Sequence, residues 1–215
     1  MTKTQIGVLA LQGDFGEHIH ALEACGAVVR TVRRPAELDG LHGLLIPGGE
    51  STTIDRLSRI FGLQQPLRAA IASGLPVYGS CAGMIMLADQ IEDGMHDQQT
   101  LGGLDIVVRR NAFGRQVDSF EAPVAISGIA GADFRAVFIR APWVESVGPD
   151  VQVLGTVTAG VGAGRIVAVR SGNLIATSFH PELTDDHRLH GLFADIARRY
   201  AHERAHEPDP KEKLG

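Results

Sequence analysis

The stretch that decides the fold is "PVYGSCAGM", residues 76–84. A short apolar run leads into Gly79, a cysteine follows at position 81, and Gly83 comes two residues later. Residues without side chains around a nucleophile permit a sharp turn from a strand into a helix, with the nucleophile in a strained backbone conformation. A buried structural thiol in a glycine-rich turn would give the same pattern, so these residues alone leave both interpretations open.

The chain before this stretch alternates between strand and helix patterns. The predicted strands are 5–11, 27–32, 43–49 and 76–80, and the predicted helices are 13–26, 51–62, 65–73 and 82–89. Ser51 or Thr52 is the expected cap of the second helix. Strands that alternate with helices predict a parallel sheet covered on both faces.

The pattern changes after about residue 104. Strand-like segments separated by turns lie at 104–110, 119–126, 136–141, 151–157, 165–172 and 173–180. This half is expected to be mostly antiparallel or mixed sheet. Apolar residues at helical spacing then predict a final helix within 184–205. We expect one domain over residues 1–204 and a charged, disordered tail at 205–215.

Composition excludes several classes of protein. Hydrophobic residues make up 44% and charged residues 21% of the 215 residues, which favours a large core over disorder. The formal net charge is −5 without a long basic run, so neither nucleic acid nor a membrane surface is expected as a partner. No apolar run reaches the roughly 20 residues of a membrane helix. With only Cys25 and Cys81, no disulfide framework is indicated, and a cytoplasmic protein is expected.

Two further segments carry chemistry. In "SFHPEL" (178–183), His180 and Glu182 would project to the same side of an extended segment, so the carboxylate could orient the imidazole toward a thiol. In "LLIPGGEST" (44–52), two adjacent glycines could turn an N–H toward an oxyanion. A histidine bonded to a neighbouring carbonyl and an ordinary strand-to-helix turn are the alternatives. The helix after Cys81 would stabilise a thiolate through its dipole.

Taken in order, "PGGEST", "GSCAG" and "SFHPEL" resemble the class I, or triad-type, glutamine amidotransferases. The segments "GVLALQGDFGEHIHALEACGA", "RRNAFGRQVDSFEA" and "FIRAP" are similar to the glutaminase subunits of pyridoxal 5′-phosphate synthase. The resemblance implies an α/β, flavodoxin-like three-layer sandwich whose central sheet is mostly parallel, with antiparallel additions in the C-terminal half. The loop at 92–103 and the charged tail depart from the family, and neither is expected to touch the chemistry.

The resemblance also implies hydrolysis of L-glutamine to L-glutamate and ammonia. Cys81 would be the nucleophile, His180 the base and acid, and Glu182 the residue that orients His180. The N–H of Ala82 and one from the Gly48–Gly49 turn would form the oxyanion hole. A separate synthase (lyase) subunit that builds pyridoxal 5′-phosphate would be the protein partner and ammonia acceptor. No cofactor and no metal are implied.

The glutamine-binding positions of the family fall on Gly49, Glu50, Ser51, Arg110, Ile139 and Arg140. An arginine suits the α-carboxylate of glutamine, but the pattern does not decide which one binds it. Arg109 and Arg110 are adjacent and would point to opposite faces of a strand, so only one should face the site.

Two alternatives remain. One is a glutaminase of another pathway, such as imidazole glycerol phosphate synthesis, against which "NAFGRQVDSFE" (111–121) speaks. The other is a non-catalytic module that senses glutamine, against which the complete set Cys81, His180 and Glu182 speaks.

The remaining histidines and the second cysteine have plainer interpretations. His18 and His20 are assigned to a possible partner surface, and Cys25 to the core at a helix end. The pairs His187 with His190 and His202 with His206 have helical spacing that could suit a metal. No third ligand is evident for either pair, so both are interpreted as solvated.

Overall fold

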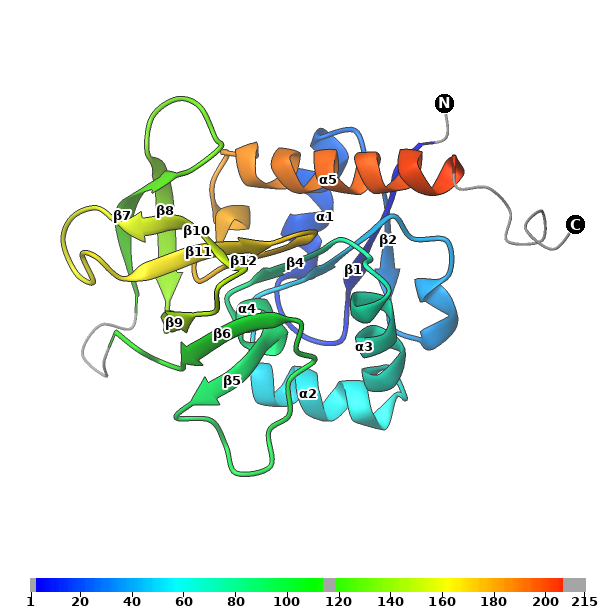
Figure 1. The fold of residues 1–215 in the computed structure, drawn as a ribbon, viewed down its shortest axis with the longest axis horizontal. Helices are drawn as coiled ribbons and strands as arrows, with labels where there is room; N and C mark the ends of the chain where they lie inside the picture. The colour runs from blue at the N-terminus through cyan, green and yellow to red at the C-terminus, as the bar shows by residue number, and fades with distance from the viewer. Residues whose placement is uncertain (1–2, 114–118, 207–215) are drawn as a thin grey trace, which may run out of the picture.

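The computed structural model describes residues 3–113 and 119–206 (Figure 1). The first half contains β1 (Gln5–Leu9), α1 (Phe15–Ala24), β2 (Val28–Val32), a 3-10 turn (Pro35–Leu38), β3 (Gly43–Ile46), α2 (Ser51–Ile60), α3 (Gln64–Ala72), β4 (Val77–Ser80) and α4 (Ala82–Leu87). The second half contains β5 (Ala88–Glu92), β6 (Leu104–Arg109), β7 (Ser119–Ile126), β8 (Phe134–Ile139), β9 (Trp143–Val147), β10 (Gln152–Val157), β11 (Ile166–Ser171), β12 (Leu174–Thr177), a 3-10 turn (Pro181–Leu183) and α5 (Arg188–Ala205).

All these strands form one sheet. Its parallel part has the order β2-β1-β3-β4-β12, which is the flavodoxin-like arrangement. It continues through the antiparallel strands β11, β10, β7 and β8, and β9 joins β6 and β5 to the edge of β11. The expected parallel sheet with antiparallel additions in the C-terminal half is confirmed.

The helices cover both faces of the parallel strands (Figure 1). On one face, α2, α3 and α4 pack on side chains such as Leu44 and Ile46 of β3. On the other face, α1 and α5 pack on Leu45 of the same strand and on Tyr78 of β4. Successive residues of a strand point to opposite faces, so the continuous apolar run of β3 is explained by burial on both sides.

The sequence predictions differ from the structure at several elements. The helix expected at 82–89 ends at Leu87, because residues 88–92 pair with β6 as strand β5. Strand β9 at 143–147 was not predicted and forms by pairing with β6 and β11. Glu50, not Ser51 or Thr52, is the N-cap residue of α2, and its side chain makes no capping hydrogen bond.

The turn between β4 and α4 is a point of very close backbone packing. A Cβ atom added at Gly83 would lie 2.2 Å from the carbonyl oxygen of Ile46 in β3. One added at Gly79 would lie 2.5 Å from the backbone of Gly83. Between them, Cys81 has φ 48° and ψ −101°, outside the regions that residues with side chains favour. The expected strained elbow is therefore confirmed.

We predict that Gly83→Ala destabilises the protein by about 1–3 kcal/mol, the typical cost of overpacking. The backbone oxygen of Ile46 cannot move away as a flexible side chain would. Gly16→Ala is the matched control, because Gly16 also lies in a helix but an added Cβ there meets nothing within 4 Å. It should be neutral or stabilising by up to about 1 kcal/mol. Urea unfolding of both variants checks this, and equal effects would refute the packing argument.

Candidate active site

The candidate site lies where the carboxyl ends of the parallel strands meet. Gln12 follows β1, Gly48 follows β3, Cys81 follows β4 and His180 follows β12. In open α/β sheets, ligands bind in the crevice at this edge. The fold therefore gathers four segments that are far apart in the sequence.

Cys81 is held by both elements that it joins. Its backbone N–H donates to the carbonyl of Thr177 in the neighbouring strand at 2.8 Å, and its own carbonyl accepts from Met84 N at 3.1 Å. The residue is 6% exposed. Ala82 begins α4, where a backbone N–H has no acceptor within the helix. An anion beside the thiol would therefore meet a free donor.

His180 and Glu182 form a buried pair. Nδ1 of His180 lies 2.7 Å from Oε1 of Glu182, and the two side chains are 6% and 0% exposed. The extended geometry expected for this segment is wrong, because Pro181–Leu183 is a 3-10 turn. A backbone bond from His180 N to the carbonyl of Val137, 2.9 Å long, anchors the turn to β8. The carboxylate meets the imidazole across the turn instead of along a strand.

The electrostatics of the pair follow from its partners. Burial alone would lower the pKa of His180, but hydrogen bonds and negative charge from Cys81 and Glu182 outweigh it and raise that pKa. Burial alone would raise the pKa of Glu182, but the ring nitrogens of His18 and His180, which face its two oxygens, outweigh it and lower that pKa. Glu182 is therefore ionised, and the imidazole of His180 lies between Glu182 and Cys81.

Gly48 lies against both the cysteine and the histidine. A Cβ atom added at Gly48 would lie 2.4 Å from Cε1 of His180 and 3.5 Å from Cβ of Cys81. A side chain at position 48 would therefore displace the imidazole. Gly49 has φ 146°, a conformation that favours glycine. Gln12 holds this turn, since its Oε1 accepts from Glu50 N at 2.7 Å, and no sequence pattern indicated this role.

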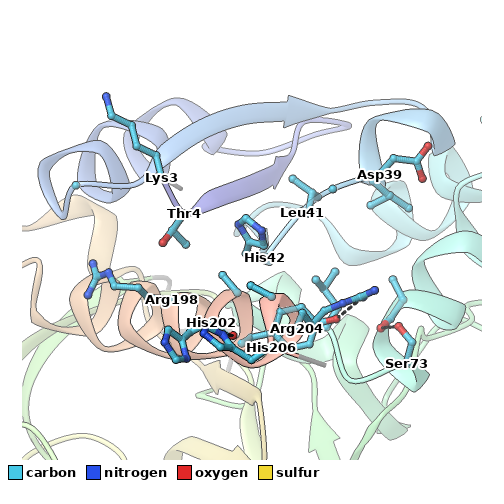
Figure 2. A pocket seen from close by; sticks show the side chains of 18 residues that line it. Lys3, Thr4, Asp39, Leu41, His42, Ser73, Arg198, His202, Arg204 and His206 are labelled. Atoms are coloured by element: carbon cyan, nitrogen blue, oxygen red, sulfur yellow. Dashed lines mark hydrogen bonds between the residues drawn. The ribbon is translucent and has the colours of Figure 1, made fainter. Parts of the chain in front are cut away.

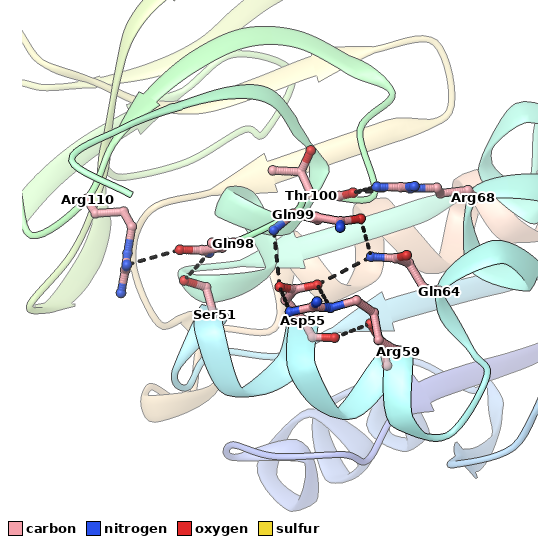
Figure 3. A network of polar contacts seen from close by, with 10 residues as sticks. Ser51, Asp55, Arg59, Gln64, Arg68, Gln98, Gln99, Thr100 and Arg110 are labelled. Atoms are coloured by element: carbon pink, nitrogen blue, oxygen red, sulfur yellow. Dashed lines mark hydrogen bonds and ion pairs between the residues drawn. The ribbon is translucent and has the colours of Figure 1, made fainter. Parts of the chain in front are cut away.

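A polar network joins three of the residues that the family resemblance assigned to glutamine, and Figure 3 labels two of them, Arg110 and Ser51. Arg110 donates to Oε1 of Glu50 at 2.8 Å and to Oε1 of Gln98 at 3.0 Å. The amide of Gln98 in turn donates to Oγ of Ser51 at 2.9 Å. Arg109 turns away and pairs with acidic side chains, of which Asp93 is 2.9 Å distant. The prediction that the two arginines face in opposite directions is confirmed.

Gln98 belongs to the loop at 92–103, which was expected to lie away from the chemistry. That expectation is wrong, because Gln98 contacts two candidate glutamine-binding residues. Buried Asp55 of α2 holds the loop by accepting from the N–H of Gln99 at 3.1 Å, and Gln64 binds the same carboxylate at 3.3 Å (Figure 3). The loop is thus attached to the helix that carries Ser51.

Ile139 and Arg140 lie outside this network. Both are exposed at the end of β8, and Arg140 has φ 42°. A backbone bond from Ala112 N to the carbonyl of Ala141, 3.1 Å long, places their segment beside the one that follows Arg110. Residues 114–118 of the "NAFGRQVDSFE" segment lie outside the described residues.

Two histidines have roles that differ from the sequence interpretation. His18 is fully buried, not on a partner surface, and its Nε2 lies 3.3 Å from Oε2 of Glu182. His190 is also fully buried, not solvated, and its Nε2 lies 2.9 Å from Nδ1 of His18. His20, two residues further along α1 and on the opposite side of the helix, is exposed. The amphipathic pattern around residues 15–22 did not separate the two.

A separate cavity of about 1040 Å³ lies at the opposite end of the parallel strands (Figure 2). Its lining includes Thr4 and His42 from the amino ends of strands and His202 and Arg204 from α5. Neither Cys81 nor His180 lines it.

Among the described residues, no helix is long and apolar enough to cross a membrane.

Sequence comparison finds a matching family and close relatives of this chain. The sequence model of the SNO glutamine amidotransferase family matches residues 8–198. A pyridoxal 5′-phosphate synthase subunit PdxT from Salinispora arenicola is 65% identical over 92% of this chain and 98% of its own. The PdxT subunit of Streptomyces avermitilis is 60% identical over 92% and 96%.

Two solved structures share the fold of this chain. A crystal structure described as a glutamine amidotransferase superposes with a TM-score of 0.82 at 45% identity, over 90% of this chain and 98% of that one. The structure of PurLQS from Thermotoga maritima shares the fold, with a TM-score of 0.61 at 17% identity, over 95% and 100% of the two chains. The chain belongs to the SNO glutamine amidotransferase family.

Proposed function

We propose that this protein is the glutaminase subunit of a pyridoxal 5′-phosphate synthase. It hydrolyses L-glutamine to L-glutamate and supplies the ammonia for the synthesis of pyridoxal 5′-phosphate. The observation that carries the proposal is the strained position of Cys81 at the start of α4, beside the buried pair of His180 and Glu182. The names of the PdxT relatives support the pathway, at 60–65% identity.

In the proposed reaction, Cys81 is the nucleophile. Its sulfur bonds to the side-chain amide carbon of glutamine while His180 takes the thiol proton. The oxyanion of the tetrahedral intermediate accepts from Ala82 N–H and from the Gly48–Gly49 turn. His180 returns the proton to the departing nitrogen, so ammonia leaves and a γ-glutamyl thioester remains. Water, deprotonated by His180, then attacks the thioester carbon, and the carbon–sulfur bond breaks as glutamate is released. The Cys81 sulfur takes the proton back from His180, and Glu182 orients the imidazole throughout.

The network around Arg110 supports a binding mode for the amino-acid end of glutamine. Glutamine carries an α-carboxylate and an α-ammonium, and Arg110 and Glu50 offer the two complementary charges 2.8 Å apart. The proposed site also includes Gly49 and Ser51 beside Glu50, and Ile139 and Arg140 at the end of β8. The Arg110 side chain is 11% exposed, so a bond between its guanidinium and the carboxylate would be partly shielded from water.

The proposed partner is the synthase subunit that consumes the ammonia. Ammonia is mostly protonated at neutral pH and is then no nucleophile, which favours delivery between subunits over release. We place the reaction in the cytoplasm, where a reducing environment would keep Cys81 as a thiol. The Gly48–Gly49 turn offers a switch, because a peptide flip there can add or remove an oxyanion donor.

Replacement of the proposed nucleophile should abolish turnover. Cys81→Ala is expected to lose essentially all glutamine hydrolysis while the fold stays intact, because no thioester can form. Cys25→Ala is the matched control and should keep normal rates, since Cys25 lies at the end of α1. Glutamate release by purified protein with the synthase subunit present is the measurement. Full activity in Cys81→Ala would favour another nucleophile, and glutamine binding without any hydrolysis by the wild type would favour a sensor.

Arg110→Ala should weaken glutamine binding by roughly 1.5–3 kcal/mol, the contribution of a charge-assisted hydrogen bond. Arg109→Ala is the matched control, because the neighbouring side chain pairs with acidic residues away from Glu50. Isothermal titration in the Cys81→Ala background separates binding from chemistry. Equal affinities of the two arginine variants would remove Arg110 from the site.

The isolated chain is expected to be a poor glutaminase that needs the synthase partner for full activity. Loss of one oxyanion donor costs roughly 10²–10³ in rate, which sets the size of the expected activation. Glutamate release is measured for the chain alone and then in the presence of the synthase partner. A free-standing glutaminase would give the same rate in both conditions.

A further inference from the structure

A chain of buried polar groups continues beyond the proposed triad. Oε1 of Glu182 is hydrogen-bonded to Nδ1 of His180, and its Oε2 lies 3.3 Å from Nε2 of His18. Nδ1 of His18 is in turn hydrogen-bonded to Nε2 of His190, at 2.9 Å. The side chains of His18 and Glu182 are 0% exposed, so water does not solvate either group. Within the described residues, neither His18 Nε2 nor Glu182 Oε2 has a hydrogen-bond partner at a suitable distance and angle. The two atoms face each other at 3.3 Å, so each is the candidate partner of the other.

The positions of the protons follow from this geometry. Burial is the largest cause that lowers the pKa of His190, to about 3, although the negative charge of Glu182 opposes the shift. His190 is therefore neutral and carries one ring proton. Its buried Nδ1 has no partner in the part of the chain that the structure describes, and an unpaired buried N–H is costly. The proton therefore belongs on Nε2, facing His18.

His18 then has one defined orientation. Its Nδ1 accepts the proton of His190, so its own proton lies on Nε2 and points to the free oxygen of Glu182. The opposite arrangement would aim a bare ring nitrogen at a carboxylate, which is repulsive. His190 is itself fixed by its neighbours, since the rings of Tyr78 and His187 lie 6.1 Å and 6.2 Å away with edge-to-face angles.

We propose that His18 is a positioning residue that acts through Glu182 on the proposed base His180. The second donor fixes the rotation of the carboxylate, so that Oε1 stays aligned with Nδ1 of His180. A carboxylate with one partner can rotate about its last bond, and a buried oxygen without a donor is destabilised. This inference rests on the proposed glutaminase function, and it extends the catalytic assembly from the loops at the sheet edge into helices α1 and α5.

The test compares two amide substitutions at position 18. In His18→Gln the amide extends as far as the imidazole Nε2 and can still donate to Glu182. In His18→Asn the amide reaches only as far as Nδ1, so the contact with His190 can be kept while the contact with Glu182 is lost. Both variants bury a polar side chain of similar or smaller volume. His20→Gln controls for substitutions in this helix, because the side chain of His20 is 76% exposed.

Initial rates of glutamine hydrolysis with the synthase subunit present are expected to separate the two amides. His18→Asn should lower kcat about 10–100-fold. This is the range found when a group that orients a metal-binding side chain is lost, and it is applied here to a group that orients a catalytic side chain. KM should not change, because His18 does not belong to the proposed glutamine-binding network. His18→Gln should keep most of the activity, and His20→Gln should match the wild type. Thermal unfolding of each variant shows the folded fraction.

Combination with Glu182→Ala identifies the route of the effect. If His18 acts only through Glu182, His18→Asn lowers kcat no further once the carboxylate is absent. Radiolabelled glutamine resolves the slow turnover of the double variant. Equal kcat of the Gln and Asn variants, or additive losses in the double variant, would overturn the inference. Hydrolysis that survives Cys81→Ala would instead overturn the proposed function, so the two failures are distinguishable.

Discussion

The close packing of α4 on the end of β3 is the constraint on which the rest of the site depends. Gly83 leaves room for the carbonyl of Ile46, so the helix can begin directly after Cys81. The same approach puts the thiol at the carboxyl edge of the sheet, where the loops after β1, β3 and β12 also begin. The strain at Cys81 persists because the sheet on one side and the helix on the other determine its backbone.

Burial makes the charge of Glu182 depend on the histidines around it. Glu182 is a carboxylate inside the protein, and it stays charged only because histidine donors face both of its oxygens. The buried charge in turn favours a proton on Nδ1 of His180, which leaves the other nitrogen toward Cys81. A side chain at position 48 would break this arrangement by displacing the imidazole. Gly48 in the turn and His18 in α1 therefore both help to hold the imidazole of His180 in place.

Much of this molecule could be predicted from the sequence, and the failures have physical causes. The alternation of apolar runs indicated the parallel sheet because doubly buried strands are continuous in hydrophobicity. Strand β5 was missed because Ala88–Glu92 follows a helix without a turn signal and becomes extended only by pairing with β6. The contact of His180 with Glu182 was predicted for the wrong backbone. Buried His18 and His190 were missed because a histidine in an amphipathic helix carries no sign of the partner it meets 172 positions away.

The most direct test of the account is whether Cys81 becomes covalently modified during turnover. Glutamine is mixed with the protein and its synthase partner, the reaction is quenched in acid, and the peptide that carries Cys81 is analysed by mass spectrometry. The account predicts a γ-glutamyl group on this peptide, removed by hydroxylamine and absent in Cys81→Ala. Turnover at the normal rate with the adduct on another residue, or with Cys81 unmodified under conditions that trap thioesters, would contradict it.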